Sequence, residues 1–487
     1  MKLLKDILFG VSIVDLLGST LVAINTVTCH SESVKKDSLF IAIQGTKKDG
    51  NLFIQESITK GSIAIICEKL PKETNSEITY IQVKSASKAY SIIAGNWFDR
   101  PSENLNIIGI TGTNGKTTTA SLLHQLFENN LVKSGLISTV KISIHNKNYP
   151  ATHTTPDAWQ IQRHLSDMVK AGCKLVFIEV SSHGLVQNRV AGINFRGGIF
   201  TNISRDHLDY HKTLDNYVIA KKLLFDNLSS SAFALVNRDD KYGDTMISDS
   251  IAKKISYGIT RESDIKARVI ESHIGGTLIS INHRECWMKL IGDFNVYNVC
   301  AVYGAAIELG MTADEALQRI SALNPVNGRF QKIEGPKGII GIIDYAHTPD
   351  ALKKILSSLQ KFRKPPQRII TIVGCGGDRD KGKRPQMASI ASRLSDYVIL
   401  TSDNPRSESP EAILKDMEDG LKKPDKKYCI SIADRSQGIR LACQNANPND
   451  IILLAGKGHE KFQEINGEKI PFDDLLILKT VLTEVQT

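Results

Sequence analysis

The chain contains no long apolar segment. Of its 487 residues, 41% are hydrophobic and 23% are charged, the usual balance of a globular protein with sizeable cores. No apolar run approaches the roughly 18 residues that a membrane-spanning helix needs. Asp6 interrupts the short apolar stretch at the N-terminus, which argues against a signal peptide. We therefore expect a cytoplasmic protein without membrane insertion.

The sequence also has no paired cysteines and no nucleic-acid-binding motif. Its 8 cysteines are scattered without a CxxC spacing, so neither a zinc site nor a disulfide framework is predicted. The formal charge is +9, but the basic residues are spread along the chain instead of forming a patch. A polyanionic small substrate explains this charge as well as a nucleic acid does, so we expect no nucleic-acid partner.

The sequence does contain a Gly-rich loop between a strand and a helix. Residues 107–110 form an apolar run typical of a buried strand, and residues 120–127 have apolar positions at helical spacing. In such a loop, backbone N–H groups and the helix N-terminus surround phosphate, a lysine adds charge, and a hydroxyl can bind Mg²⁺. We predict that ATP phosphates contact Gly112, Thr113, Asn114, Gly115, Lys116, Thr117 and Thr118.

One glycine of the common phosphate-binding loop is missing. That pattern has four residues between its two glycines, and Ile110 occupies the first glycine position here. The glycines that bracket the loop are Gly112 and Gly115. This variant disfavours ordinary GTPases and transport ATPases, which act by conformational change.

Two turn-rich breaks, at residues 99–104 and 335–338, divide the chain. Its length agrees with about three domains, and alternating strands and helices indicate mostly parallel sheets. We expect an α/β protein with a small domain at 1–98, a central phosphate-loop domain at 99–334 and a Rossmann-like domain at 335–487. Strands are predicted at 38–45, 62–67, 78–83, 107–110, 175–180, 198–202, 339–343, 369–373, 397–401 and 451–455, and helices at 87–98, 120–127 and 158–171, with helix caps at Thr312 and Thr348.

Several polar residues are candidates for metal or nucleotide contacts. Glu179 ends a predicted strand, where ligands of open α/β sheets bind, and it suits Mg²⁺ as well as it suits an ion pair. His207 lies in the segment Ser-Arg-Asp-His-Leu-Asp-Tyr-His, and its density of ligand-type side chains favours a metal or nucleotide role, whereas His211 is expected to be structural. Asn295 and Asn298 share a helix face and fit either an adenine edge or a helix cap.

Three polar loops follow successive predicted strands near the C-terminus. They contain Arg379, Arg406 and Glu460, among other polar residues. Because carboxyl ends of parallel strands meet at one edge of a sheet, these loops should converge on one cleft. Arginine suits a carboxylate and an acid suits an ammonium, so the predicted ligand is an amino acid.

Six motifs in order make the whole chain similar to the Mur ligases, and specifically to the branch that adds the third residue of the peptidoglycan stem peptide. They are the phosphate loop, the segments 179–185, 204–209, 344–350 and 403–406, and the Gly-Asp-Arg-Asp loop at 377–380. The resemblance implies ATP-dependent amide formation on UDP-N-acetylmuramoyl-L-alanyl-D-glutamate through an acyl phosphate. It also implies that the small N-terminal domain binds UDP, that meso-diaminopimelate is the acceptor, and that the enzyme works as a monomer with ATP and Mg²⁺.

The resemblance assigns roles to individual residues. Catalysis falls to Lys116, His207 and Lys221, and metal binding to Thr117, Glu179, His207 and Lys221, the last as a carbamate. From the residues alone, Lys221 is interpreted as a helix-surface lysine. Further ATP contacts are implied for Asn295, Asn298, Arg329, Asp344 and His347. The UDP-sugar dipeptide is assigned to Ser31, Thr46, Lys47, Lys48, His153, Thr154, Thr155, Ser181, Gln187 and Arg189. Diaminopimelate is assigned to Arg379, Asp403, Asn404, Pro405, Arg406, Gly456 and Glu460.

The chain departs from the family pattern at two places. His30-Ser31-Glu32 stands where the family often has Asp-Ser-Arg, which removes an arginine near the expected diphosphate. His153 stands where asparagine is common. Alternative interpretations are a lysine-adding enzyme, a folylpolyglutamate-type ligase, a phosphate-loop switch and an inactive binding module.

Overall fold

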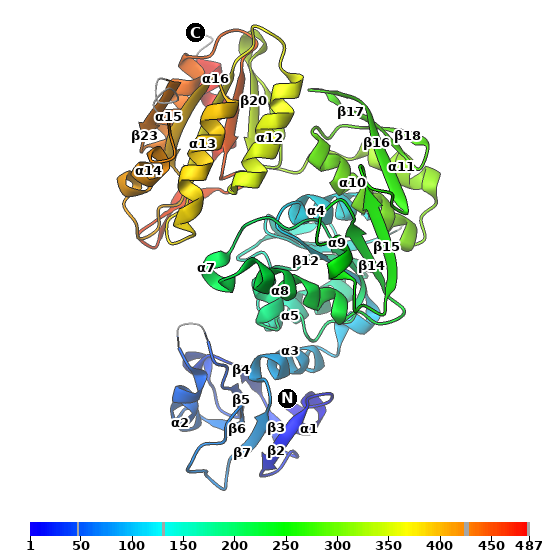
Figure 1. Ribbon diagram of the computed structural model, residues 1–487. Coiled ribbons are helices and arrows are strands. Elements are labelled where there is room, and N and C mark those ends of the chain that lie inside the picture. The colour runs from blue at the N-terminus through cyan, green and yellow to red at the C-terminus, as the bar shows by residue number, and fades with distance from the viewer. Residues whose placement is uncertain (46–47, 129–131, 423–427, 485–487) are drawn as a thin grey trace.

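The computed structural model of the protein describes residues 1–45, 48–128, 132–422 and 428–484. Three sheets follow one another along the chain, each with its own helices (Figure 1). The N-terminal lobe, the central lobe and the C-terminal lobe are arranged in that order, with the central one in between. The predicted α/β class with three successive sheets is confirmed.

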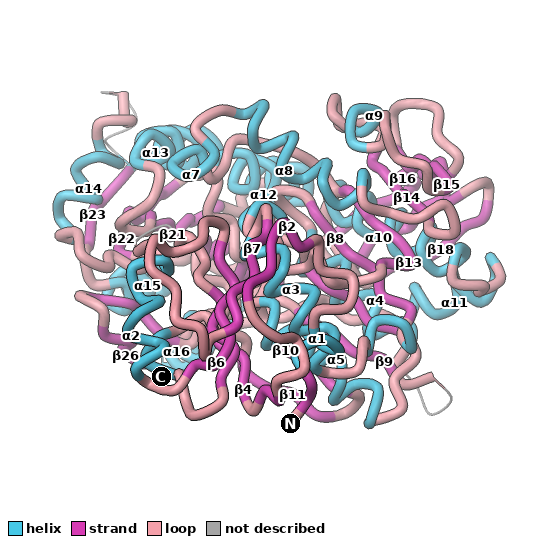
Figure 2. Tube along the Cα trace, turned by 90° about the horizontal axis from the view of Figure 1, so that it is seen from below, coloured by secondary structure: helices cyan, strands magenta, loops and turns pink. Residues whose placement is uncertain are grey.

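The N-terminal lobe contains a five-stranded sheet in the order β2-β7-β6-β5-β4. Its β2 edge is antiparallel to β7 and the other pairs are parallel. Figure 2, seen from below, shows this sheet in front of the rest of the molecule. Its elements are α1 (Leu4–Ile7), β2 (Ile13–Leu17), β4 (Thr26–Thr28), β5 (Ser38–Ile41), α2 (Ile54–Thr59), β6 (Ser62–Cys67), β7 (Thr79–Val83) and α3 (Ala86–Trp97), with β1 (Lys2–Leu3) and β3 (Ala23–Ile24) forming a separate pair.

The central lobe contains an eleven-stranded sheet in the order β11-β10-β9-β12-β8-β13-β14-β15-β16-β17-β18. Pairs from β9 to β16 are parallel, whereas β10, β11, β17 and β18 extend the two ends as antiparallel hairpins. The strands are β8 (Asn106–Thr111), β9 (Ser134–Ile137), β10 (Lys141–Ile144), β11 (Lys147–Pro150), β12 (Leu175–Glu179), β13 (Phe195–Phe200), β14 (Phe233–Asn237), β15 (Lys253–Gly258), β16 (Ile265–His273), β17 (Gly276–Ile281) and β18 (Arg284–Met288).

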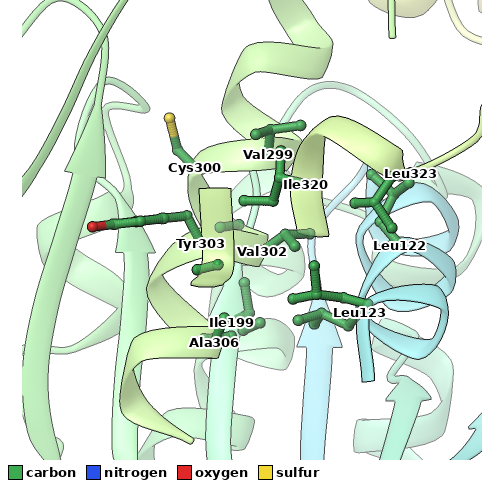
Figure 3. Close-up of a cluster of buried hydrophobic side chains, with 14 of the residues drawn as sticks. Leu122, Leu123, Ile199, Val299, Cys300, Val302, Tyr303, Ala306, Ile320 and Leu323 are labelled. Carbon is green, nitrogen blue, oxygen red and sulfur yellow. The ribbon is translucent and has the colours of Figure 1, made fainter. Parts of the chain in front are cut away.

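Helices cover both faces of the central sheet, as a parallel sheet requires. Figure 3 shows one core, in which Leu123, Val299 and Ile320 come from three different helices and lie in one cluster with Ile199 of β13. A second core lies against α5 and α8. The helices are α4 (Lys116–Phe127), α5 (Ala158–Lys170), α6 (Ser182–Val186), α7 (Leu208–His211), α8 (Leu214–Asp226), α9 (Gly243–Met246), α10 (Asp293–Glu308) and α11 (Ala313–Ala322).

The C-terminal lobe contains a six-stranded sheet in the order β19-β20-β24-β21-β22-β23, parallel except at β19. Its strands are β19 (Gln331–Glu334), β20 (Ile340–Asp344), β21 (Ile369–Cys375), β22 (Tyr397–Ser402), β23 (Cys429–Ile432) and β24 (Ile451–Ala455). Its other elements are α12 (Pro349–Phe362), α13 (Arg384–Leu394), α14 (Pro410–Glu418), α15 (Arg435–Gln444), the hairpin of β25 (Phe462–Ile465) and β26 (Glu468–Pro471), and α16 (Asp474–Glu484).

The structure differs from the expected third domain at its start. β19 begins at Gln331 and pairs with β20, so this strand joins the C-terminal sheet although the expected boundary lies after residue 334. An antiparallel edge strand of four residues carries little sequence signal, which explains the difference. The boundary after residue 98 stays a prediction.

The predicted strands and helices appear in the structure, with ends shifted by a few residues. Both predicted helix caps are confirmed: Thr312 accepts a hydrogen bond from the Glu315 backbone N–H, and Thr348 accepts one from that of Ala351. The antiparallel hairpins of the central sheet and the β25–β26 hairpin were not predicted. Among the described residues, no helix is both long and apolar enough to cross a membrane.

The core of the central lobe makes a stability prediction. Replacing the fully buried Ile320 by alanine (Ile320→Ala) should lower the free energy of unfolding by about 2–5 kcal/mol, because it removes packed methyl groups and leaves a cavity. The matched control is Ile251→Ala, in the same lobe, where the side chain is 71% exposed. Urea unfolding followed by circular dichroism measures both. Equal losses in the two variants would contradict the packing shown in Figure 3.

Candidate functional site

The Gly-rich loop joins the end of β8 to the start of α4. Gly112 has a φ of +146°, and a Cβ atom there would lie 1.9 Å from the Thr201 hydroxyl oxygen, so only glycine fits. Lys116 Nζ donates to the carbonyl oxygens of Gly112 and Thr113, each at 2.9 Å. The lysine is thereby held over the loop whose backbone N–H groups it would assist in binding phosphate.

Asn114 at the tip of this loop contacts the C-terminal lobe. Its backbone N–H donates to Asn202 Oδ1 at 3.0 Å, which fixes the loop to the end of β13. Its side-chain amide donates to Asp350 Oδ2 of α12 at 3.2 Å. The phosphate loop therefore lies at the boundary between two lobes.

Glu179 is fully buried at the end of β12. Its carboxylate accepts hydrogen bonds from the Thr117 hydroxyl at 2.9 Å and from the backbone N–H of Thr139 at 2.8 Å. Arg329 Nη2 donates to the same Thr117 hydroxyl at 3.0 Å. Among the ion pairs of the described residues none includes Glu179, so the ion-pair interpretation of this residue finds no support there.

His207 adopts a left-handed conformation, with a φ of +53°, immediately before α7. Its backbone N–H donates to Asp206 Oδ1 at 2.9 Å, and its ring lies 4.9 Å from that of His183. Asp206 Oδ2 lies 3.5 Å from His207 Nε2 and 3.9 Å from His347 Nε2, so one carboxylate faces imidazoles from two lobes. Burial lowers the pKa of both His207 and His347. Neutral imidazoles can act as metal ligands.

Lys221 is buried, so the interpretation as a helix-surface lysine was wrong. Its side chain is 1% exposed on α8, and Nζ donates to the Gly112 carbonyl oxygen at 2.8 Å. Burial and the nearby Lys116 ammonium lower the pKa of Lys221 well below its usual range. A lowered pKa makes the unprotonated, nucleophilic form of this amine easier to reach than in an exposed lysine.

Asn295 and Asn298 lie on the first turns of α10, facing the same region. Asn295 Nδ2 donates to the Ile291 carbonyl oxygen at 2.8 Å, and Asn298 Nδ2 donates to Asn295 Oδ1 at 3.0 Å. The residue at the cap position is Gly292, which has no side chain to cap the helix. Neither asparagine serves as that cap.

Arg329 and Asp344 lie where the chain enters the C-terminal sheet. The Arg329 guanidinium lies over the Tyr345 ring, 4.4 Å from its centroid. Asp344 Oδ2 accepts a hydrogen bond from the Phe330 backbone N–H at 2.6 Å. Burial raises the pKa of Asp344 to about 6, although Arg329 opposes the shift.

The polar loops that follow the C-terminal strands do converge. Asn404 Nδ2 donates to Glu460 Oε2 at 2.8 Å, which joins the loops after β22 and β24. Arg406 has a φ of +54°, donates from Nη1 to the Gly377 carbonyl oxygen at 2.7 Å, and pairs through Nε with Glu464 at 3.1 Å. Arg406 is thus held by the loop after β21 and by the β25–β26 hairpin.

One cavity of about 720 Å³ brings most of these predicted residues together. Its walls come from the central and C-terminal lobes. The predicted site residues that line it are Thr113, Asn114, Gly115, Lys116, Thr117, Thr118, Thr154, Glu179, His207, Asn295, Asn298, Arg329, Asp344, His347, Arg379, Asp403, Asn404, Arg406, Gly456 and Glu460. A volume of this size accommodates small-molecule ligands.

The predicted UDP-sugar residues form a separate cluster beside this cavity. Arg189 Nη1 donates to the Thr155 carbonyl oxygen at 2.6 Å, and Nη2 donates to Gln187 Oε1 at 2.6 Å. The Ser181 backbone N–H donates to the Thr155 hydroxyl at 2.9 Å. Thr154 belongs to both groups, since it lines the cavity.

The remaining predicted residues lie elsewhere. Ser31 is half-buried in the N-terminal lobe, where its carbonyl oxygen accepts a hydrogen bond from Lys60 Nζ at 3.2 Å. Lys48 and His153 are exposed. None of these three lines the cavity. Thr46 and Lys47 lie outside the described residues.

Sequence reasoning missed Thr139 and Lys457. Thr139 follows β9 and donates to Glu179, both from its backbone N–H and from its hydroxyl at 3.1 Å, and its hydroxyl also lies 3.0 Å from that of Thr154. The strand-end rule that identified Glu179 would also have identified Thr139. Lys457 contacts Asn404 and Glu460. His211, expected to be structural, is buried and hydrogen-bonds the Ser182 hydroxyl through Nε2 at 2.9 Å.

Comparison with known proteins identifies the family. The Mur ligase family catalytic domain matches residues 23–96, the Mur ligase middle domain matches 110–306, and the Mur ligase glutamate ligase domain matches 328–458. The chain belongs to the Mur ligase family, a family of ATP-dependent ligases.

Among its relatives is the UDP-N-acetylmuramoyl-L-alanyl-D-glutamate–2,6-diaminopimelate ligase of Cytophaga hutchinsonii, 48% identical over 98% of this chain and 99% of the relative. The protein of the same name from Bacteroides thetaiotaomicron is 47% identical over the same shares. A solved structure of a ligase of this name is 30% identical, with a TM-score of 0.70, and covers 100% of this chain and 99% of its own.

A fourth similarity concerns the fold alone. A folylpolyglutamate synthase of Mycobacterium tuberculosis, solved with ADP and AMPPCP, has a TM-score of 0.61 at 16% identity. It covers 74% of this chain and 91% of its own length. This similarity shows a shared fold over about three quarters of the chain, and a shared fold does not imply a shared function.

The buried Asp344 makes a pH prediction. Its pKa is about 6 in the folded protein and about 3.9 in an unfolded chain. Between these values the folded state keeps a proton that the unfolded state has lost, so this group makes stability decline as the pH rises from about 4 to about 6, with no further loss above. Asp344→Asn lacks this decline and can still accept the Phe330 hydrogen bond.

We therefore expect the urea midpoint of Asp344→Asn, relative to that of the wild type, to increase as the pH rises from about 4.5 to about 6.5. Asp244→Asn, at a side chain that is 69% exposed, is the matched control. A constant difference between Asp344→Asn and the wild type over this range would contradict the raised pKa.

Proposed function

We propose that this protein joins meso-2,6-diaminopimelate to the D-glutamate of UDP-N-acetylmuramoyl-L-alanyl-D-glutamate, using ATP, in peptidoglycan synthesis. One observation supports this most strongly: a single cavity is lined by the phosphate loop on one side and by the Arg406 and Glu460 loops on the other. The relatives that share 46–48% identity over nearly the whole chain have this activity in their names.

In the proposed reaction ATP phosphorylates the free carboxylate of D-glutamate, which gives an acyl phosphate and ADP. The amine of diaminopimelate attacks the acyl carbon, the tetrahedral intermediate collapses, and the phosphate leaves as the amide forms. Lys116 and Arg329 would neutralise charge on the transferring phosphate, because both cations face the Thr117 region of the cavity. Enclosure between two lobes would protect the acyl phosphate from water.

The residues around Glu179 suit Mg²⁺. Glu179 is a buried carboxylate whose hydrogen-bond donors are the hydroxyls of Thr117 and Thr139 and a backbone N–H, and oxygen donors of this kind suit a hard cation shared with phosphates. Thr117, Glu179 and His207 would hold it, together with Lys221 if that lysine is carbamylated. The cation would supply neutralisation of phosphate charge. Among the described residues no three His, Cys, Asp or Glu side chains form a metal-binding group, so substrate oxygens would complete the ligand set.

The remaining predicted residues are assigned to the other parts of ATP and to the UDP-sugar dipeptide. The adenine side of ATP is assigned to Asn295 and Asn298, with Asp344 and His347 completing the ATP contacts. The sugar and dipeptide are assigned to Thr154, Thr155, Ser181, Gln187 and Arg189, with His153, Ser31 and Lys48 nearer the UDP end. Thr139 shares a hydrogen bond with Thr154 and donates to Glu179, which supports assigning the dipeptide to the neighbourhood of Glu179. Enzymes with these substrates act in the cytoplasm, and we propose that this one does so as a monomer.

The arginines of the C-terminal loops favour diaminopimelate over lysine. Lysine lacks the distal carboxylate that Arg406, with Arg379, would bind, while Gly456, Asp403 and Glu460 would lie near the ammonium. The folylpolyglutamate alternative is disfavoured because residues 23–96 match a Mur ligase domain. A phosphate-loop switch would need no amine acceptor.

The proposed function is tested by supplying ATP, Mg²⁺ and the UDP-dipeptide with either diaminopimelate or lysine, and measuring phosphate release and tripeptide formation. We expect both to require the nucleotide-sugar and an amine, with diaminopimelate strongly preferred. Phosphate release that needs neither substrate would contradict the ligase function. A preference for lysine would contradict only the acceptor specificity.

Arg406 makes a second prediction. Arg406→Lys should raise the KM for diaminopimelate by about tenfold or more, because a point charge replaces a planar group that binds a carboxylate at two points. Lysine also cannot make both the Gly377 and Glu464 contacts. The control is Arg393→Lys on the exposed face of α13. An unchanged KM in Arg406→Lys would show that Arg406 does not bind the carboxylate.

A further inference from the structure

A lysine with no exposed surface lies behind the amine end of the proposed amino-acid pocket. Lys457 follows β24, and its side chain is 0% exposed. Nζ donates to Asn404 Oδ1 at 3.0 Å and to Glu460 Oε2 at 3.0 Å, and lies 3.6 Å from Asp403 Oδ1. A buried ammonium is costly unless it is paired, and all three partners belong to the pocket.

The carboxylates of Asp403 and Glu460 repel each other in the absence of a counter-charge. Burial and the neighbouring Asp403 raise the pKa of Glu460, and Lys457 opposes this shift. With Lys457 present, the two acids and the lysine carry one net negative charge, which matches one substrate ammonium. Other charged or titratable groups near Glu460 include Tyr345 after β20, Arg435 of α15, and the chain neighbours His459 and Lys461. Arg435 is itself paired with the fully buried Asp474.

Lys457 is also connected to the carboxylate end of the pocket. Asn404 Oδ1, which accepts from Lys457, also accepts from the Glu464 backbone N–H at 3.0 Å. The Glu464 side chain pairs with Arg406 Nε, and the Glu464 carbonyl oxygen accepts from the Arg406 backbone N–H at 2.9 Å. The chain of contacts therefore runs from Lys457 through Asn404 and Glu464 to Arg406.

We propose that Lys457 is a positioning residue for the amino-acid substrate, which supplies the positive charge beside Asp403 and Glu460 and, through Asn404 and Glu464, holds the arginine that faces the opposite end. This inference rests on the proposed function, since it concerns the same acceptor pocket. Lys457 does not line the cavity, so it acts through its neighbours and not by touching the substrate.

The test compares Lys457→Met with the wild type in steady-state kinetics. We expect the KM for diaminopimelate to rise by about tenfold or more, with the KM for ATP and for the UDP-dipeptide within about twofold of the wild type. Lys461→Met, in the same loop at a side chain that is 67% exposed, is the matched control and should change none of these constants.

A pH profile and a double variant separate positioning from simple loss of structure. Without Lys457 the Glu460 carboxyl keeps its proton to higher pH, so the diaminopimelate KM of Lys457→Met should fall as the pH rises. In Lys457→Met with Glu460→Gln, glutamine does not titrate and one acid remains. This double variant should lose that pH dependence and be no worse than Lys457→Met alone near neutral pH.

Three outcomes contradict the inference: an unchanged KM in Lys457→Met, a raised KM that does not depend on pH, or additive losses in the double variant. If Lys457→Met does not fold, Lys457→Gln removes the charge while keeping a donor for Asn404, and the same profile applies. Failure of both to fold would make Lys457 a purely structural residue and overturn the proposal. Wild-type protein that transfers no amino acid contradicts the proposed function itself.

Discussion

The carbonyl oxygen of Gly112 accepts hydrogen bonds from two lysines, and much of the proposed active site depends on that arrangement. Lys116 reaches it from the loop and Lys221 from α8. No side chain fits at Gly112, because a Cβ atom there would lie 1.9 Å from the Thr201 hydroxyl oxygen. The ends of β8 and β13 lie side by side here. Lys221, whose pKa is lowered by burial, contacts the same glycine of the Gly-rich loop.

Much of this site could be predicted from the sequence, because parallel strands end at the same edge. Glu179, Arg406 and Glu460 were found by following strands to their carboxyl ends, and all three line one cavity. The Gly-rich loop could equally be predicted from the sequence, since its glycines, lysine and threonine lie within eight residues of chain. A site is easiest to recognise in the sequence when its residues lie together in one short segment that joins a strand to a helix.

Other features depended on contacts between distant residues and stayed hidden. Lys221 is charged and lies on a helix, so its burial against Gly112, 109 residues away in the chain, leaves no local trace. Arg406 is held by Glu464 of a short hairpin, and Lys457 by loops that begin at other strands. The hairpin of β10 and β11 was missed because each strand has only four residues.

The hydrogen bond between Arg329 and Thr117 has a mechanical consequence. Arg329 lies just before β19, where the chain passes from the central lobe to the C-terminal sheet. Its neighbour Phe330 has a φ of +47° and is hydrogen-bonded to Asp344. In any rotation about this junction, a residue moves in proportion to its distance from the pivot. Arg329 would therefore stay beside the Gly-rich loop in such a rotation, whereas residues of the C-terminal lobe farther from the junction would move more.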